Sequence, residues 1–158
     1  MNKTESKMVE ILQRGRENHG IVSVKAEFEA EGTRVDELLR LLDVIRAAGL
    51  PLTVKIGGCE AIRDLLEAKQ FGVRYVVAPM VETAYAGEKY VDAKNLVFTK
   101  QEQEETDFLF NLETITGFDN RVALIEATAH ENGADGVVFG RVDFVGSQRK
   151  PREAINLP

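Results

Sequence analysis

Apolar residues recur along the chain with two alternating periods. Short runs rich in β-branched and aromatic residues, bounded by Gly, Pro or polar residues, predict strands over residues 20–29, 51–58, 73–80, 107–113 and 136–144. The segments between them place apolar residues three and four positions apart, as on one face of a helix. These stripes are Val35, Leu38, Leu39, Leu42 and Ile45, then Ile62, Leu65 and Leu66, then Val122, Ile125 and Ala129.

Each helical stripe is followed by a glycine that can end a helix, at Gly49, Gly72 and Gly133. The polar segment 98–106 predicts a solvated helix or a loop. No change of composition marks a boundary between domains. The expectation is one domain over residues 1–158.

Strands that alternate with helices predict an α/β fold with parallel strands and right-handed crossovers. Five strands in 158 residues suit an open, doubly wound parallel sheet, whereas a TIM barrel typically needs about 250 residues. Length therefore favours the open sheet. The pattern within the strands favours a barrel.

Side chains alternate across a strand, so each predicted strand has two faces. One face is apolar in every strand, and polar residues gather toward the carboxyl end of the other. An open sheet covered by helices on both sides is apolar on both faces, whereas the inner face of a barrel becomes polar where active sites lie. We therefore expect a TIM-barrel-type repeat with an inward face that contains Lys25, Glu27, Lys55, Asn111, Glu113, Arg141 and Asp143.

Composition and charge exclude several classes of partner and location. The net charge of −6 gives no basic surplus for nucleic acid. The single cysteine, Cys59, suits a reducing compartment, and no apolar run reaches the roughly 20 residues of a membrane span. The polar opening MNKTESK lacks the apolar region of a signal peptide. The expectation is a cytoplasmic protein that binds neither nucleic acid nor membrane.

Five segments carry a resemblance to a known family: KAEFEAEGTR, VKIGGCEAIRDLLEAKQFGV, VVAPMVETAYA, FNLET and GADGVVFGRVDFVGS. Together they resemble the 2-oxo-acid aldolase and citrate lyase family of the phosphoenolpyruvate/pyruvate barrel superfamily. The resemblance covers roughly residues 20–147. Its most specific parts are Pro-Met-Val-Glu at 79–82, Glu113, and the Gly-x-x-Asp motif at 140–143.

The resemblance implies a metal-dependent carbon–carbon lyase that acts on a 2-oxo acid or a related anion through a pyruvate-like enolate. Glu113 and Asp143 would bind one divalent ion, Mg²⁺ or Mn²⁺, and hard oxygen ligands suit both ions. Lys55 stands where the family usually has an arginine that steadies the keto or enolate oxygen. Lysine keeps the charge of that group but loses the bidentate fork.

The sequence also departs from the family pattern. Related aldolases often carry a catalytic Glu-His pair after the first of these strands, but Glu29 is followed by Ala30. His19 and His130 lie outside any predicted strand end. Glu27, Glu29 or a metal-bound water would then serve as the general base. Arg141 stands where many relatives have proline.

Alternatives stay open for the site and for the reaction. Glu113 and Asp143 could instead form a buried ion-pair network with Lys25, Lys55 and Arg141. The reaction could be that of a citrate lyase-like or acyl-CoA ester lyase. A catalytically silent structural or ligand-binding relative is the alternative outside enzymes.

Counted against the family, the five predicted strands correspond to the second to sixth of eight. The chain is then an incomplete or truncated barrel, a partial barrel completed by oligomerisation, or an open-sheet binding protein. Unpaired strand edges normally need cover. We therefore expect a homo-oligomer.

Overall fold

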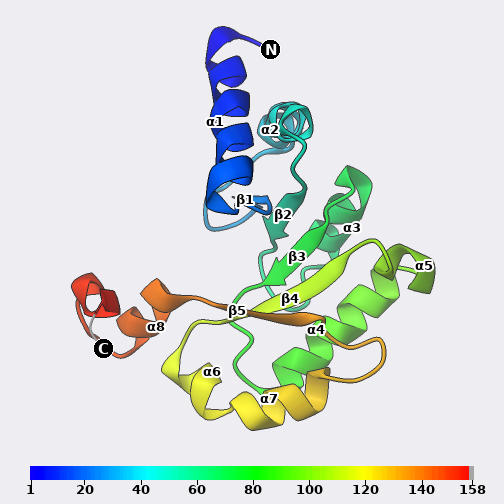
Figure 1. Cartoon of the computed structure of the whole chain (residues 1–158). Coiled ribbons are helices and arrows are strands. Elements are labelled where there is room, and N and C mark those ends of the chain that lie inside the picture. Colours follow the sequence, from blue (N-terminus) through cyan, green and yellow to red (C-terminus); the bar gives the residue numbers. More distant parts are fainter. Residues whose placement is uncertain (157–158) are drawn as a thin grey trace.

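Five parallel strands form one sheet whose strand order follows the chain, in a computed structural model that describes residues 1–156 (Figure 1). The strands are β1 (Val24–Glu27), β2 (Leu52–Lys55), β3 (Tyr75–Ala78), β4 (Asp107–Leu112) and β5 (Gly136–Phe139). The helices are α1 (Lys3–His19), α2 (Val35–Ala48), α3 (Ile62–Phe71), α4 (Ala84–Val97), α5 (Lys100–Gln103), α6 (Ile115–Asp119), α7 (Arg121–Thr128), α8 (Arg141–Ser147) and the 3-10 helix η1 (Arg152–Asn156).

The strand order decides between the two predicted architectures. A doubly wound sheet reverses its order at a switch point. Here every strand pairs in parallel with the next one along the chain, from β1 to β5, as in a (β/α) barrel. The fold is therefore the predicted barrel-type repeat, with five strands of the barrel present among the described residues.

The two faces of the sheet differ as predicted. Residues that face the helices are apolar and fully buried, and they include Val54, Val76 and Phe108. On the opposite face, the pairing register sets Lys25 beside Thr53 and Glu27 beside Lys55. Burying the apolar face contributes about 25 cal/mol per Å² of apolar surface, so this face holds the sheet to its helices.

The first two predicted helix ends are confirmed. α2 and α3 are followed by Gly49 and Gly72, both in the left-handed conformation, with φ of 68° and 66°. The third helix differs from the prediction: α7 ends at Thr128, and Gly133 lies in the following loop.

The buried face of α7 also differs from the predicted stripe. Leu124 and Thr128 are buried, whereas Val122 and Ile125 are exposed. The reason is Gly87 in α4, because a Cβ built there would lie 2.6 Å from Thr128 Cγ2 and 3.5 Å from Leu124 Cδ2. The missing side chain at Gly87 lets α7 approach α4 through the face that carries Leu124 and Thr128.

The predicted fifth strand, 136–144, is too long. β5 stops at Phe139 and the chain enters α8 at Arg141, so Arg141 and Asp143 are helix residues and not strand residues. Gly140 still donates its N–H to Leu112 O at 3.1 Å, and the N–H of Phe144 then bonds to Gly140 O. The alternation of Arg141, Val142 and Asp143 imitates a strand, but these residues form the first turn of a helix.

The outer strands have one neighbour each. Val137, Val138 and Phe139 of β5 are 37–48% exposed, so this strand is open on both faces. β1 forms the other edge of the sheet. In Figure 1, α8 and η1 extend away from the end of β5, whereas α1 packs against α2. No helix within residues 1–156 is long and apolar enough to cross a membrane.

Candidate active site

A cavity of about 720 Å³ opens at the carboxyl ends of the strands. Its lining includes four of the five predicted site residues, Glu29, Lys55, Glu113 and Asp143. The fifth, Glu27, does not line the cavity but bonds to Lys55. The carboxyl ends of parallel strands are where barrel enzymes place their active sites.

Glu113 lies directly after β4 and is 5% exposed. Its Oε2 accepts a hydrogen bond from Asn111 Nδ2 at 2.7 Å, and its Oε1 accepts one from the backbone N–H of Met80 at 2.9 Å. Gly140 approaches from β5 so closely that a Cβ there would lie 2.7 Å from Glu113 Cβ. The carboxylate is thus held from three sides by β4, the β3–α4 loop and the end of β5.

Glu113 has no ion pair with a lysine or arginine in the described part of the chain. The two nearby lysines, Lys25 and Lys55, both bind Glu27 instead. The predicted alternative, an ion-pair network that includes Glu113, is therefore absent from residues 1–156. A nearly buried carboxylate with only neutral donors retains lone pairs for a cation.

Met80 has an uncommon backbone conformation, with φ of 52°. A non-glycine residue in the left-handed region costs roughly 1–2 kcal/mol. This conformation directs the Met80 N–H at Glu113, while the side chain is 57% exposed and lines the cavity. Met80 belongs to the Pro-Met-Val-Glu motif at 79–82, but nothing in the sequence indicated a role for its backbone N–H.

Glu27 binds two lysines on the inward face of the sheet. Its carboxylate lies 2.5 Å from Lys25 Nζ and 2.9 Å from Lys55 Nζ. Burial acts to raise the pKa of Glu27, but hydrogen bonds and charge from the two lysines outweigh it, so the pKa lies below its ordinary value. Glu27 is therefore an ionised partner that fixes the position of Lys55, whose side chain is 16% exposed.

Glu29 lies in the loop after β1 and is, like Asp143, an exposed carboxylate that lines the cavity. It lies close to Gly57, where an added Cβ would be 2.5 Å from Glu29 Cγ. The N–H of Gly57 bonds to Asp64 Oδ2 at 2.7 Å. Burial raises the pKa of Asp64, the Gly57 hydrogen bond opposes this, and the charge of Glu29 adds to the rise. A close approach of Glu29 and Asp64 therefore requires glycine at position 57.

Asp143 reaches the same cavity from the first turn of α8. The helix is tied to the β4–α6 segment by Ser147, whose Oγ accepts a hydrogen bond from the N–H of Ile115 at 2.9 Å and donates one to Phe144 O. Glu113 and Asp143 thus line one cavity, although Asp143 comes from a helix and not from the predicted strand end.

The carboxylate oxygens that line the cavity are of the kind that a hard divalent ion prefers. No cluster of three or more His, Cys, Asp or Glu side chains that could hold a metal occurs within residues 1–156. Mg²⁺ is commonly bound by one or two carboxylates, with waters and substrate oxygens completing the octahedron. Glu113, a nearly buried carboxylate without a cation partner, fits that requirement together with Asp143.

Solved structures share this fold at low sequence identity. A citrate synthase SbnG structure superposes with a TM-score of 0.70 at 19% identity, over 93% of this chain and 61% of that chain. An HpcH/HpaI aldolase/citrate lyase family protein from Burkholderia cenocepacia J2315 gives 0.71 at 15% identity, over 98% and 66%. An HpcH/HpaI aldolase from Desulfitobacterium hafniense DCB-2 gives 0.69 at 15% identity, over 89% and 61%.

The chain thus spans about 61–66% of the length of these structures, and its fold is a partial TIM barrel. Comparison with curated protein sequences gives no match. A family model for the HpcH/HpaI aldolases and citrate lyases matches residues 19–156, which is most of the chain. This match confirms the resemblance found in the sequence, and the chain belongs to the HpcH/HpaI aldolase/citrate lyase family.

Proposed function

We propose that the protein is a metal-dependent carbon–carbon lyase of the aldolase type that acts on a 2-oxo acid through a pyruvate-like enolate. The observation that carries the proposal is Glu113, a 5% exposed carboxylate without an ion pair in the described chain, which shares a cavity with Asp143 and Lys55. Membership of the HpcH/HpaI family supports this class of reaction.

Glu113 and Asp143 would hold one Mg²⁺ or Mn²⁺. A divalent ion bound there would stabilise negative charge on the keto oxygen of the substrate by several kcal/mol. The hydrogen bonds from Asn111 and Met80 keep the Glu113 carboxylate in place and leave further lone pairs on both oxygens. The N–H groups of Asn111 and Met80 therefore position the Glu113 carboxylate as a ligand for the metal ion.

Lys55 would bind the substrate oxygen on which charge develops. Lys55 lines the cavity, and its ammonium group is held by Glu27 at 2.9 Å. An ammonium donates up to three hydrogen bonds, so the bond to Glu27 leaves donors for the substrate. In this scheme Glu27 is a positioning residue, because its own acceptors already bind Lys25 and Lys55.

Glu29 is the candidate general base. In cleavage of a 4-hydroxy-2-oxo acid, its carboxylate would take the proton of the C4 hydroxyl as the C3–C4 bond breaks. The bonding electron pair then forms the enolate, the aldehyde leaves, and a proton returned to C3 gives pyruvate. Glu29 is suited to this role because it is an exposed carboxylate in the cavity without an ion pair in the described chain, and because Asp143, the other exposed carboxylate there, is assigned to the metal ion.

Calorimetric titration with Mn²⁺ tests the metal site. We expect wild-type protein to bind the ion, and Glu113→Gln and Asp143→Asn to lose binding, because each substitution removes a negative oxygen ligand. Glu126→Gln, an exposed substitution in α7, is the matched control and should bind as the wild type does. Unchanged binding in both site variants would refute the assignment.

Product assays then separate the reactions. Pyruvate release from 4-hydroxy-2-oxo acids that depends on Mg²⁺ or Mn²⁺ and stops with a chelator supports the aldolase. Cleavage of acyl-CoA esters or of citrate under the same conditions would assign the protein to one of the other lyase classes. Metal binding without turnover of any of these substrates would identify a catalytically silent relative.

We also propose that the protein is a homo-oligomer formed from a single domain over residues 1–158. The exposed faces of β5 and the free edges of β1 and β5 support self-association. Strand edges in stable proteins are normally paired or covered. A second copy that covers these edges would provide the missing contacts.

A further inference from the structure

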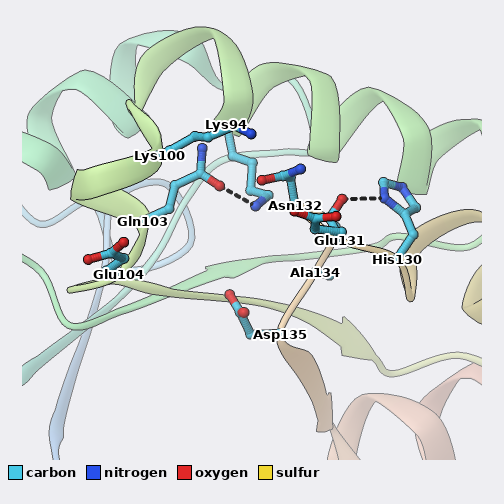
Figure 2. Close-up of a pocket in the computed structure, with 10 residues that line it drawn as sticks. Lys94, Lys100, Gln103, Glu104, His130, Glu131, Asn132, Ala134 and Asp135 are labelled. Atoms are coloured by element: carbon cyan, nitrogen blue, oxygen red, sulfur yellow. Dashed lines mark hydrogen bonds between the residues drawn. The ribbon is translucent and has the colours of Figure 1, made fainter.

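A second cavity, of about 340 Å³, lies at the opposite end of the sheet, beside the start of β5 (Figure 2). α4 and α5 form one side of it, and the loop between α7 and β5 forms the other. Lys94, Lys100 and Gln103 come from the helical side, whereas His130, Glu131 and Asp135 come from the loop. None of these residues belongs to the cavity that contains Glu113.

Lys94 is a buried lysine, only 2% exposed, that lines this cavity. Its Nζ donates a hydrogen bond to Gln103 Oε1 at 2.7 Å, and the same nitrogen lies 4.9 Å from the centre of the Phe108 ring. Neither partner carries a negative charge. Across residues 1–156, Lys94 has no ion pair with an Asp or Glu, although lysine is rarely buried without one.

The carboxylate of Asp135 could neutralise Lys94, but it bonds to a backbone N–H instead. Asp135 lies across the cavity, and its Oδ2 accepts a hydrogen bond from the N–H of Phe108 at 2.7 Å. Burial lowers the pKa of Lys94, and the charge of Asp135 opposes this only in part. Lys94 therefore places an ammonium group with unused donors beside the cavity.

We propose that this cavity binds a small oxyanion, a carboxylate or a phosphate, with the Lys94 ammonium as its charged anchor. Gln103 holds the ammonium group in place through its side-chain oxygen, and Lys100 adds positive charge on the same side. Three carboxylates, those of Glu104, Glu131 and Asp135, also line the cavity, and their repulsion favours a small anion that contacts Lys94 directly over a large or highly charged one. The site is separate from the proposed active site and does not depend on the proposed reaction.

Thermal unfolding in acetate and in phosphate, against chloride at equal ionic strength, tests the proposal. An anion that binds only the folded protein raises its melting temperature, by roughly 5–10 °C at 100 times the dissociation constant for a chain of this size. The more effective anion identifies the source of the oxyanion. Lys94→Met should abolish this shift, and Lys94→Arg should retain it.

Lys89→Met is the matched control, because it removes the same charge from the same helix at a position paired with Glu60. It should keep the full response to the anion. In wild-type protein, the side-chain amide signals of Gln103 should also shift on addition of the effective anion, which tests the site without any substitution. Equal responses of the wild type and Lys94→Met to both anions, or unmoved Gln103 signals, would overturn the proposal.

Discussion

Two strands with similar sequences have opposite environments. β3 is Tyr-Val-Val-Ala and β5 is Gly-Val-Val-Phe, and both are short parallel strands. Val76 and Val77 of β3 are at most 3% exposed, whereas Val137 and Val138 of β5 are 47% and 37% exposed. β3 pairs on both edges, whereas β5 pairs only with β4.

The difference shows that neighbours, and not composition, decide burial in this sheet. The apolar residues of β5 match those of a strand covered on both faces, as in a complete barrel. Relatives of known structure are longer, and the chain covers 61–66% of their length. β5 therefore has the sequence of a central strand and the surroundings of an edge strand.

The largest expected effect is self-association through the unpaired edges of β1 and β5. Each buried-type backbone group left unpaired costs on the order of 1–3 kcal/mol, and a row of them can cancel a domain's net stability of roughly 5–15 kcal/mol. We expect light scattering after size exclusion at low micromolar concentration to show a homo-oligomer. A compact monomer with a cooperative, concentration-independent melt would show that the edges are satisfied within the chain.

Substitutions of two phenylalanines, one in β4 and one in β5, compare the centre of the sheet with its edge. Phe108 in β4 is fully buried and packs edge-to-face on Phe98, with 4.8 Å between ring centres. Phe108→Ala should lower the free energy of unfolding by about 3–5 kcal/mol. Phe139 is 48% exposed, so Phe139→Ala should cost less than about 1 kcal/mol when the protein is dilute.

Urea denaturation at several protein concentrations measures both variants. If β5 is covered in an assembly, Phe139→Ala should lower the midpoint only at concentrations where the wild type is oligomeric. A loss for Phe139→Ala as large as that for Phe108→Ala in dilute protein would show that β5 is buried within one chain.

Two glycines test how firmly β5 is joined to the centre. A Cβ at Gly140 would lie 2.7 Å from Glu113 Cβ, so Gly140→Ala forces Glu113 or the strand to move. We expect a loss of about 1–3 kcal/mol and weaker Mn²⁺ binding. Gly146→Ala in α8, where an added Cβ has nothing within 4 Å, should be neutral or stabilising. Equal effects of the two substitutions would mean that Gly140 does not press on Glu113.

The smallest expected effects concern the pH dependence of stability that Glu27 and Asp64 cause. The pKa of Glu27 is lowered in the folded protein, so its stabilising effect is present above the ordinary value of 4.5 and is lost as the pH falls through the folded pKa. Glu27→Gln should therefore cost on the order of 1 kcal/mol at pH 7, and the difference from the wild type should shrink below about pH 4.5.

Asp64 makes the stability change with pH in the opposite direction. Its pKa is raised above the ordinary 3.8, so the folded protein holds this proton more firmly and stability falls as the pH rises from 3.8 through the folded pKa. Asp64→Asn should remove that fall. Melting temperatures of both variants between pH 3 and 7 measure the two slopes, and slopes of the same sign would contradict the assignment.

Much of the fold followed from the sequence. The four strands from β1 to β4 lie within their predicted ranges, because short β-branched or aromatic runs bounded by Gly, Pro or polar residues mark them. The fifth was too long, since four residues such as Arg141–Phe144 fit either period, and the sequence alone does not distinguish the end of a strand from the first turn of a helix there. α1 and α4 were not predicted. The apolar residues of α4 are spread around the helix, so no single stripe marks it.

The grouping of the candidate site residues followed from the sequence, but their contacts did not. The sequence brought Glu113, Asp143 and Lys55 to one place, and the structure has all three on one cavity. It could not show that Lys25 and Lys55 both bind Glu27, because the choice among nearby carboxylates depends on side-chain reach across paired strands. Nothing in the sequence indicated that Lys94 is buried, since a lysine in a helix normally indicates an exposed position.

The strand order has a consequence for how the protein forms during synthesis. Each strand pairs with the one made just before it, and the paired residues are no more than 32 positions apart, as between Tyr75 and Asp107. A growing chain can therefore add one strand and helix at a time to a sheet that already exists, because short loops close at little entropic cost. β5 joins last of the five, when the surface formed by β1 to β4 is already in place.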